Sequence, residues 1–214
     1  EYLLIKIPLL GKTLGSEINY ELAKCTSNSV IKQLCFEKRY GYLNLVSIDT
    51  EDNILFVHNA LEQVKEDDDT HYQNFIELKS EKQITNQFYD FENLIYKENP
   101  KCDFVVSSNQ SPFKVTDEDD TQSSNHKGLL YFNENSRSLR IKALIREKEK
   151  LNIEDLKQVL FDTKVIKPII RNVDFSTLFS LNQQEYPKLS QLISILKNWD
   201  GNADLNSKGA ALFS

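Results

Sequence analysis

Two short apolar runs in the first third of the chain have the composition of β-strands and follow each other closely. They cover residues 43–48 and 54–57, and Asp, Thr, Glu and Asn fill the five positions between them. Aliphatic runs separated by a few turn-forming residues favour a hairpin, so we predict one here. Residues 2–7 and 104–106 also have strand-like composition, and we predict a short strand at each.

Apolar residues recur with helical spacing in the last third of the chain. They stand three and four positions apart at residues 139–145, 156–160 and 189–196, which places them on one face of a helix. Asn152 and Asp155 precede the second segment in the spacing of a capping box. We interpret the apolar stripe of the third segment as core packing.

Polar residues and a glycine next to the helical segments indicate where helices begin and end. Ser27 or Asn28 can cap a helix that carries apolar residues on one face as far as Cys35. Gly201 follows the third helical segment and is a suitable helix terminator. Ser207 can cap one further helix, of which the chain contains only the first turns.

Composition divides the chain into two parts. Residues 1–134 combine strands with loops, whereas residues 135–214 are helical. The chain opens inside a strand-like run, and a helix as short as the last one is marginal on its own. We therefore expect an α/β fold, and we expect the chain to be a fragment that is truncated at both ends.

Length and charge exclude several classes of protein. The chain has 214 residues, of which 40% are hydrophobic, enough to bury a sizeable core. Its formal net charge of -6 argues against nucleic-acid and anionic-membrane partners, which bind basic surfaces. No apolar run approaches the roughly 18 residues that a membrane-spanning helix needs.

Cysteine and histidine spacing does not indicate a metal site. Cys25, Cys35 and Cys102 form no CxxC pair, and the histidines have no HExxH spacing. One disulfide among the cysteines stays open as an alternative. The chain also has no GxSxG nucleophile elbow and no phosphate-binding loop. Composition and periodicity alone leave its activity unassigned.

Residues 44–61 combine an Asn, a strand that ends in Asp49 and, after Asp52, an Asn-Ile pair that leads into an aromatic strand. This order resembles the penicillin acylase family, in which a Gly precedes the Asn-Ile pair. Asp52 stands in the place of that Gly. Because Asp tolerates the left-handed backbone conformation better than most residues do, we predict that the turn is kept.

A second stretch, residues 99–113, resembles the segment of that family that supplies the oxyanion hole. An Asn-Pro pair begins at Asn99, and Asn109 follows within an Asn-x-x-Pro run. In the family, the side chain at the position of Asn109 donates to the oxyanion of the tetrahedral intermediate. Asp103 replaces a Gly of the family pattern and Ser107 replaces an Asn, and these two departures leave Asn109 in place.

A third stretch carries two arginines and a Trp-Asp-Gly motif. Family members have an arginine near the active site that helps to hold the oxyanion-hole Asn, and Arg137 matches it best, with Arg140 as the second candidate. Residues 199–201 and 210–213 resemble the end of the family's helical region. The three stretches follow each other in the family's order and cover about residues 40–214, which makes the resemblance specific.

The resemblance implies a fold and a reaction. Members of the family are αββα N-terminal-nucleophile hydrolases, whose precursor cuts itself to expose a serine at the start of the β-chain. That serine lies upstream, and Glu1 cannot replace it, so we expect this chain alone to be inactive. The parent would hydrolyse the amide of an N-acylated small molecule, such as an acyl-homoserine lactone or a penicillin-type amide. The implied partners are the α-chain and the N-terminal part of the β-chain, in a periplasmic or secreted protein.

Each implied role has an alternative. An Asn placed like Asn109, shortly before a proline, is a common turn former, and Arg137 could be an exposed charge near a helix start. Family members can bind one structural calcium ion through an Asp in the following loop, which Asp120 matches by spacing; no cofactor is required. The chain could also be a non-catalytic binding or interaction domain that keeps the scaffold.

Overall fold

The structure is a computed structural model, and it describes residues 15–37, 43–60, 89–90, 93–118, 134–166 and 175–213. The chain forms two compact units, Glu1–Asn133 and Glu134–Ser214. The strand predicted at residues 2–7 and the predicted calcium ligand Asp120 lie outside the described residues.

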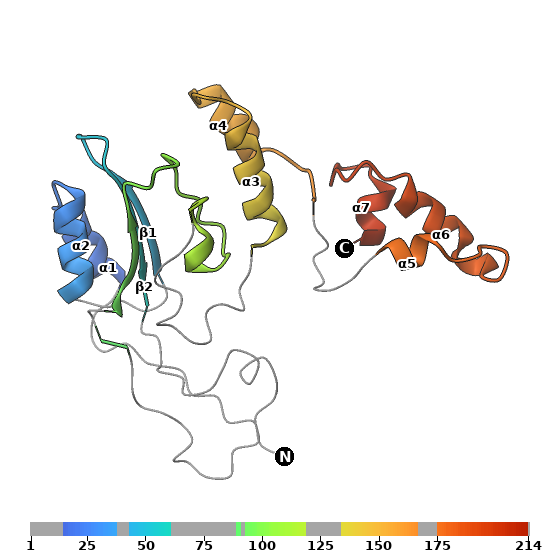
Figure 1. Cartoon of the computed structure of the whole chain (residues 1–214), viewed down its shortest axis with the longest axis horizontal. Coiled ribbons are helices and arrows are strands. Elements are labelled where there is room, and N and C mark those ends of the chain that lie inside the picture. Colours follow the sequence, from blue (N-terminus) through green and yellow to red (C-terminus); the bar gives the residue numbers. More distant parts are fainter. Residues whose placement is uncertain are drawn as a thin grey trace, which may run out of the picture. The chain divides into compact units, whose positions relative to one another are not determined.

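Within the described residues, the first unit is built on a three-stranded antiparallel sheet in the order β1-β2-β3 (Figure 1). The strands are β1 (Leu43–Ile48), β2 (Ile54–Asn59) and β3 (Ile95–Glu98). The register pairs Leu45 with Val57, and Val57 in turn with Tyr96. The predicted hairpin is confirmed, because β1 and β2 are joined by the turn at residues 49–53.

β2 is the centre of the first unit's core because it is the middle strand. Leu55, Phe56 and Val57 are all fully buried, so both faces of this strand are covered. Leu55 and Val57 share one face and pack with Cys35 and Leu94. A strand that is covered on both faces needs apolar residues in succession rather than in alternation, which is the pattern found here.

Two helices precede the sheet, α1 (Gly15–Leu22) and α2 (Asn28–Glu37). The helix predicted at α2 is confirmed, and Ser27 caps it by accepting the N–H of Val30 at its Oγ. α2 packs against β2, with Cys35 in the shared core, whereas Val30 is exposed although the pattern places it on the apolar face. The sequence does not predict α1, which contains few apolar residues.

The third strand does not lie where the sequence predicts it. Residues 104–106 are irregular, and the strand forms instead at β3. The N–H of Val106 donates to the carbonyl of Val115 within a local loop rather than to a neighbouring strand. β3 escapes prediction because Lys97 and Glu98 interrupt its apolar pattern.

The second unit is helical. Its helices are α3 (Ser136–Arg146), α4 (Ile153–Leu160), α5 (Phe175–Phe179), α6 (Pro187–Lys197) and α7 (Lys208–Phe213). The predicted capping box of α4 is confirmed, because Asn152 Oδ1 accepts the N–H of Asp155 at 3.0 Å and Asp155 Oδ2 accepts the N–H of Asn152 at 2.9 Å. Ser207 caps α7 as predicted, and the short helix α5 is not predicted.

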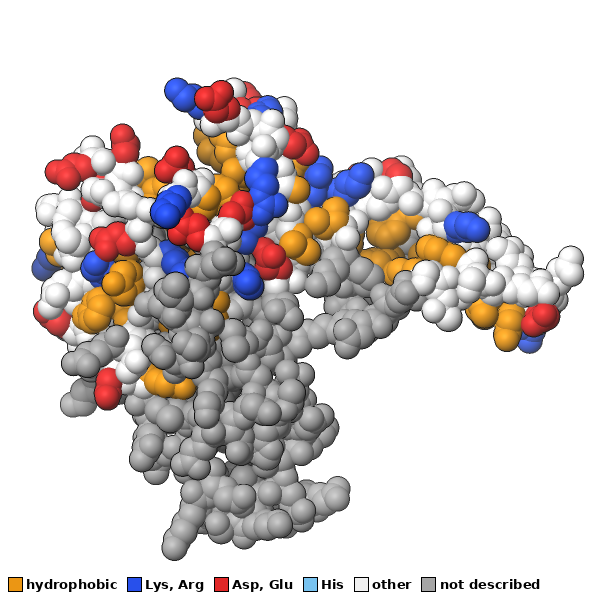
Figure 2. All heavy atoms as spheres, in the orientation of Figure 1, with side chains coloured by type: hydrophobic (Ala, Val, Ile, Leu, Met, Phe, Trp, Pro, Cys, Tyr) orange, Lys and Arg blue, Asp and Glu red, His pale blue; other side chains and the backbone are white. Residues whose placement is uncertain are grey.

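The apolar faces of α4 and α6 are only partly covered within the described residues. On α6, Ile193 is buried, but Leu189 and Leu192 are 41% and 40% exposed, so the interpretation of the whole stripe as core packing is wrong. On α4, Leu160 is 75% exposed. Hydrophobic side chains accordingly reach the surface over the helices of this unit (Figure 2). Helical spacing predicts that a face is apolar but does not say what covers it.

Gly201 lies beyond the end of α6 rather than at its terminus. The helix ends at Lys197 with Asn198 as its C-cap, so the prediction that Gly201 terminates the helix is wrong. Gly201 has a φ of 83°, which suits glycine, and its carbonyl accepts the N–H of Val165 at 2.8 Å. This bond ties the turn after α6 to the segment that follows α4.

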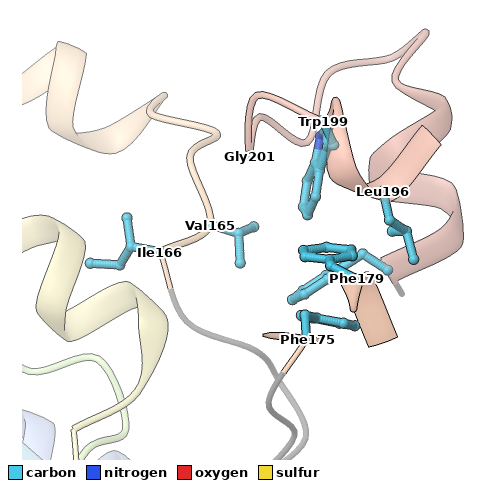
Figure 3. A pocket seen from close by; sticks show the side chains of 8 residues that line it. Val165, Ile166, Phe175, Phe179, Leu196, Trp199 and Gly201 are labelled. Atoms are coloured by element: carbon cyan, nitrogen blue, oxygen red, sulfur yellow. The ribbon is translucent and has the colours of Figure 1, made fainter. Parts of the chain in front are cut away.

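The C-terminal helices meet around a cluster of aromatic rings. The ring centroids of Trp199 and Phe213 are 5.0 Å apart, and those of Phe213 and Phe175 are 5.8 Å apart. A hollow of about 210 Å³ lies beside these rings (Figure 3). Gly209 lies directly under the indole, where an added Cβ would be 2.2 Å from the Cγ of Trp199.

The described residues form a mixed fold of helices and a small antiparallel sheet, which is compatible with the predicted α/β class. The strands lie in the first unit, and helices α3 to α7 lie in the second. None of the helices within the described ranges is long and apolar enough to cross a membrane.

Candidate active-site segment

Residues 106–115, which contain the predicted oxyanion-hole Asn, form a loop that closes on itself. At its base, the N–H of Val106 donates to the carbonyl of Val115 at 2.8 Å. Loops whose ends lie close together and whose interior is filled by their own side chains are compact, and such loops are frequent carriers of function. The backbone of this segment is therefore set largely by contacts within it.

The returning side of the loop is anchored to the sheet. It contains the 3-10 helix η4 (Pro112–Lys114), and Pro112 suits the first helical position because no N–H donor is needed there. Ser111 caps this helix, with its Oγ accepting the N–H of Phe113 at 3.3 Å. Phe113 is buried and packs against Ile95 of β3, so the loop is fixed to the core of the first unit.

Gln110 fills the inside of the loop. Its Oε1 accepts the N–H of Ser108 at 2.7 Å and the Oγ hydroxyl of the same residue at 3.1 Å. Its Nε2 donates to the carbonyl of Val106 and, at 3.4 Å, to that of Lys114. Sequence reasoning gives Gln110 no role, because these bonds become visible only once the loop has folded.

Asn109 lies on the outer side of the same loop. Its side chain is exposed, and its backbone has a φ of 66°. Asn adopts this left-handed conformation more readily than most residues do. The two neighbouring amides are thus used differently, since Gln110 is buried and Asn109 faces the solvent. An exposed side-chain amide can donate an N–H to an anionic oxygen without any change in its own charge.

Asn99 attaches the beginning of the segment to β2. Its backbone N–H donates to the carbonyl of Ile54 at 2.9 Å, and its side-chain Oδ1 accepts the N–H of Ile54 at 2.8 Å. The side chain thereby extends the hydrogen bonding between β2 and β3 by one residue. The Nδ2 of Asn99 also donates to Oδ1 of Asn53 at 3.0 Å, within the turn between β1 and β2.

Asp49 holds the turn to which Asn99 is attached. Its Oδ1 accepts the N–H groups of Glu51 and Asn53, both at 3.0 Å, and its Oδ2 accepts the N–H of Asn28 at 3.3 Å. Partial desolvation raises the pKa of Asp49, but the hydrogen bonds from Asn53 and Asn28 outweigh it and lower the pKa below its ordinary value. The ionised carboxylate therefore joins α2, the turn and the start of the candidate segment.

Left-handed backbone conformations occur in this segment and in the turn between β1 and β2. Among the residues that the structure describes, four non-glycine residues have positive φ: Asp52 (61°), Asn99 (45°), Asp103 (56°) and Asn109 (66°). The prediction that Asp52 keeps the turn in place of a Gly is confirmed by its conformation. Asp103, which also replaces a Gly of the family pattern, has a positive φ as well, a conformation that Gly adopts readily.

The two predicted arginines lie on α3, in the second unit. Arg137 is exposed in the first turn of the helix. Arg140 forms a bidentate ion pair with Asp162, with Nε 2.9 Å from Oδ1 and Nη2 2.7 Å from Oδ2. This hydrogen-bonded pair raises the pKa of Arg140 and lowers the pKa of Asp162. Arg140 thus joins α3 to the segment after α4, whereas Asn109 belongs to the first unit, so pairing of either arginine with Asn109 stays a prediction.

The calcium site also stays a prediction. In the described ranges, no group of three or more His, Cys, Asp or Glu side chains is placed to hold a metal ion, and Asp120 lies outside those ranges. Cys25, Cys35 and Cys102 are free thiols, so the alternative of a disulfide among them is not found in this structure.

A comparison with protein-family models finds a match that covers most of the chain. The family model described as Penicillin amidase matches residues 19–214. No curated protein matches the chain. The match to the family model spans both structural units and includes the loop at residues 106–115 as well as α3.

Proposed function

Because the chain belongs to the penicillin amidase family, we propose that it is a segment of an amidohydrolase that cleaves the amide bond of an N-acylated small molecule. The family indicates a hydrolase of the amidase type. The substrate class that we propose is an acyl-homoserine lactone or a penicillin-type amide. In this proposal, both units belong to the β-chain of an αββα N-terminal-nucleophile hydrolase.

The proposed reaction begins at a residue outside this chain. A serine at the N-terminus of the β-chain attacks the amide carbonyl, and its own α-amino group accepts the hydroxyl proton. An α-amino group suits this task because its pKa of about 8 lies close to neutral pH. The attack turns the carbonyl oxygen into an oxyanion, which needs hydrogen-bond donors that are already in position. The partners required are the α-chain and the N-terminal part of the β-chain.

Asn109 is the proposed donor to this oxyanion. The observation that carries the proposal is an exposed amide on a loop closed by its own hydrogen bonds, within the region matched by the family model. A donor on such a loop needs little reorganisation when negative charge develops in the transition state, which is the condition under which it accelerates the reaction.

Replacing Asn109 with Ala in the full-length parent protein tests this assignment. We expect kcat to fall by about 10²–10³ while KM changes little, because the hydrogen bond forms fully only in the transition state. The rate of hydrolysis of N-acyl substrates measures the effect. Asn206→Ala, at an exposed Asn of the second unit, is the matched control and should leave kcat unchanged. A kcat of Asn109→Ala within a few-fold of the parent would contradict the assignment.

Two further residues belong to the same proposal. Arg137 would help to hold Asn109, and Arg140, which forms an ion pair with Asp162, is the second candidate. Asp120 would contribute to one structural calcium ion, which the reaction itself does not require. Calorimetry with calcium tests that site. If calcium produces no heat of binding and no shift in melting temperature, the site is ruled out. The parent is proposed to be periplasmic or secreted.

The alternative function is a non-catalytic binding or interaction domain on the same scaffold. The upstream sequence of the parent separates the two, because the enzyme needs a serine that follows a small residue at the start of its β-chain. A parent without such a serine would support the alternative. Hydrolysis of an N-acyl substrate that is lost in Asn109→Ala would support the enzyme.

A further inference from the structure

Among the residues that the structure describes, the buried side-chain amide of Gln110 bonds only within its own loop. It is 6% exposed, yet its side chain has four hydrogen-bond partners: two groups of Ser108 and the carbonyls of Val106 and Lys114. Both ends of the amide are therefore satisfied, which removes the penalty of burying a polar group. Such a side chain contributes to the shape of the loop rather than to contacts elsewhere.

The four bonds join the two sides of the loop. Val106 and Ser108 lie on the side that leads to Asn109, and Lys114 lies on the side that returns to the sheet. A carboxamide is the side chain suited to this position, because the bonds require an acceptor and a double donor on the same group. The backbone bond between Val106 and Val115 closes the base below it.

Asn109 directly precedes Gln110 in the chain, and it has a left-handed backbone conformation. A residue persists in a sparsely populated conformation when its surroundings fix it. The bonds of Gln110 to Ser108 and Val106 fix the backbone on one side of Asn109, and the bond to Lys114 fixes the other. The direction of the Asn109 side chain is consequently coupled to the amide of Gln110.

We propose that Gln110 is a positioning residue, whose buried amide braces the loop so that the Asn109 side chain points where the oxyanion forms. This inference rests on the proposed oxyanion role of Asn109. Gln110 itself touches neither substrate nor oxyanion in this proposal. Its effect on the reaction passes through Asn109 alone, and that restriction makes it testable.

The kinetic signature follows from the stage at which Asn109 acts. A displacement of the reacting groups by about 1 Å can cost roughly 10²-fold in rate. Because the oxyanion exists only along the reaction path, a loosened donor lowers kcat and leaves KM nearly unchanged. A residue that merely stabilised the fold would instead lower the amount of active protein and its melting temperature.

The test uses the full-length parent protein with Gln110→Ala, Gln110→Glu and Gln110→Asn. Gln110→Glu keeps the size and the acceptor but removes the donors to Val106 and Lys114, so we expect kcat to fall by about 10- to 100-fold, as for Gln110→Ala. Gln110→Asn keeps the amide on a shorter side chain, so its kcat should fall less than that of Gln110→Ala or Gln110→Glu. Gln158→Ala and Gln158→Glu, at an exposed Gln of α4, are the matched controls and should leave kcat unchanged.

A double variant separates positioning from a general effect. If Gln110 acts through Asn109, then Asn109→Ala combined with Gln110→Ala should have the kcat of Asn109→Ala alone, because the donor is already absent. If the losses of kcat in the two single variants multiply in the double variant, the inference is wrong. If Gln110→Ala does not fold, the same cycle is run with Gln110→Asn, and hydrogen exchange over residues 106–115 should be faster in that variant than in the parent.

The outcomes for the two proposals are distinct. A large loss in Asn109→Ala together with unchanged kcat in all Gln110 variants would overturn the positioning role and leave the oxyanion role standing. An active Asn109→Ala variant would instead remove the oxyanion role on which the inference rests.

Discussion

The loop around Asn109 and the helices of the second unit are held in different ways. In the loop, Gln110 and the backbone bond of Val106 satisfy polar groups within ten residues of sequence, and the loop is anchored by one buried ring. In the second unit, side chains cap the starts of α3, α4 and α7, yet Leu160 on α4 and Leu192 on α6 stay exposed on apolar faces. Local hydrogen bonds thus determine the shape of the candidate segment, whereas capping determines where helices begin and leaves their packing open.

Truncating one buried and one exposed side chain gives the largest expected contrast between the two regions. Phe56→Ala removes a fully buried ring from β2 and should lower the free energy of unfolding by about 3–5 kcal/mol. Leu160→Ala on α4 should change it by less than about 0.5 kcal/mol, because that side chain is already exposed. Urea unfolding followed by circular dichroism measures both. A loss at Leu160 comparable to that at Phe56 would show that the face of α4 is covered in the folded protein.

In the second unit, α7 packs closely against the indole of Trp199 at Gly209. Gly209→Ala should lower the free energy of unfolding by about 1–3 kcal/mol, because the new Cβ overlaps the ring of Trp199. Trp199 is the only tryptophan, so its fluorescence during unfolding reports on this unit. Ala211→Leu, at an exposed position of the same helix, is the control. Unchanged stability in Gly209→Ala would mean that the indole can move aside.

The ion pair between Arg140 and Asp162 gives a smaller, pH-dependent effect. The hydrogen bonds from Arg140 lower the folded-state pKa of Asp162, so the stability that they provide is present above the ordinary aspartate pKa and is lost as pH falls through the lowered value. Arg140→Ala should cost about 1 kcal/mol at pH 7. The difference from the parent should then shrink towards zero on acidification. Unfolding curves from pH 7 to pH 2 check this, and a difference independent of pH would contradict it.

Local sequence signals predict much of the fold. The hairpin follows from two aliphatic runs around a polar turn, and the capping box of α4 follows from Asn152 and Asp155, because both depend on residues close in sequence. β3 depends instead on its pairing with β2, and its own composition is ambiguous. The burial of α4 and α6 likewise depends on neighbours that no local pattern encodes.

The same division applies to the candidate site. A motif singles out Asn109, and the tolerance of Asp for positive φ predicts the conformation of Asp52, since both are properties of single positions. The brace at Gln110 and the attachment of Asn99 to Ile54 are relations between groups that meet only in the folded chain. Sequence reasoning therefore identifies the chemical group and misses what supports it.

Asp52 and Asp103 stand where the family pattern has glycine, and this affects how such sequences should be compared. Where the family pattern has glycine and this chain has aspartate, the backbone has a φ of 61° at Asp52 and 56° at Asp103, angles that glycine adopts readily. Gly, Asn and Asp are the residues that adopt this left-handed conformation most readily, so any of the three can keep such a turn. Divergent relatives are best recognised by scoring those three residues as one class, since identity counting treats a preserved turn as a mismatch.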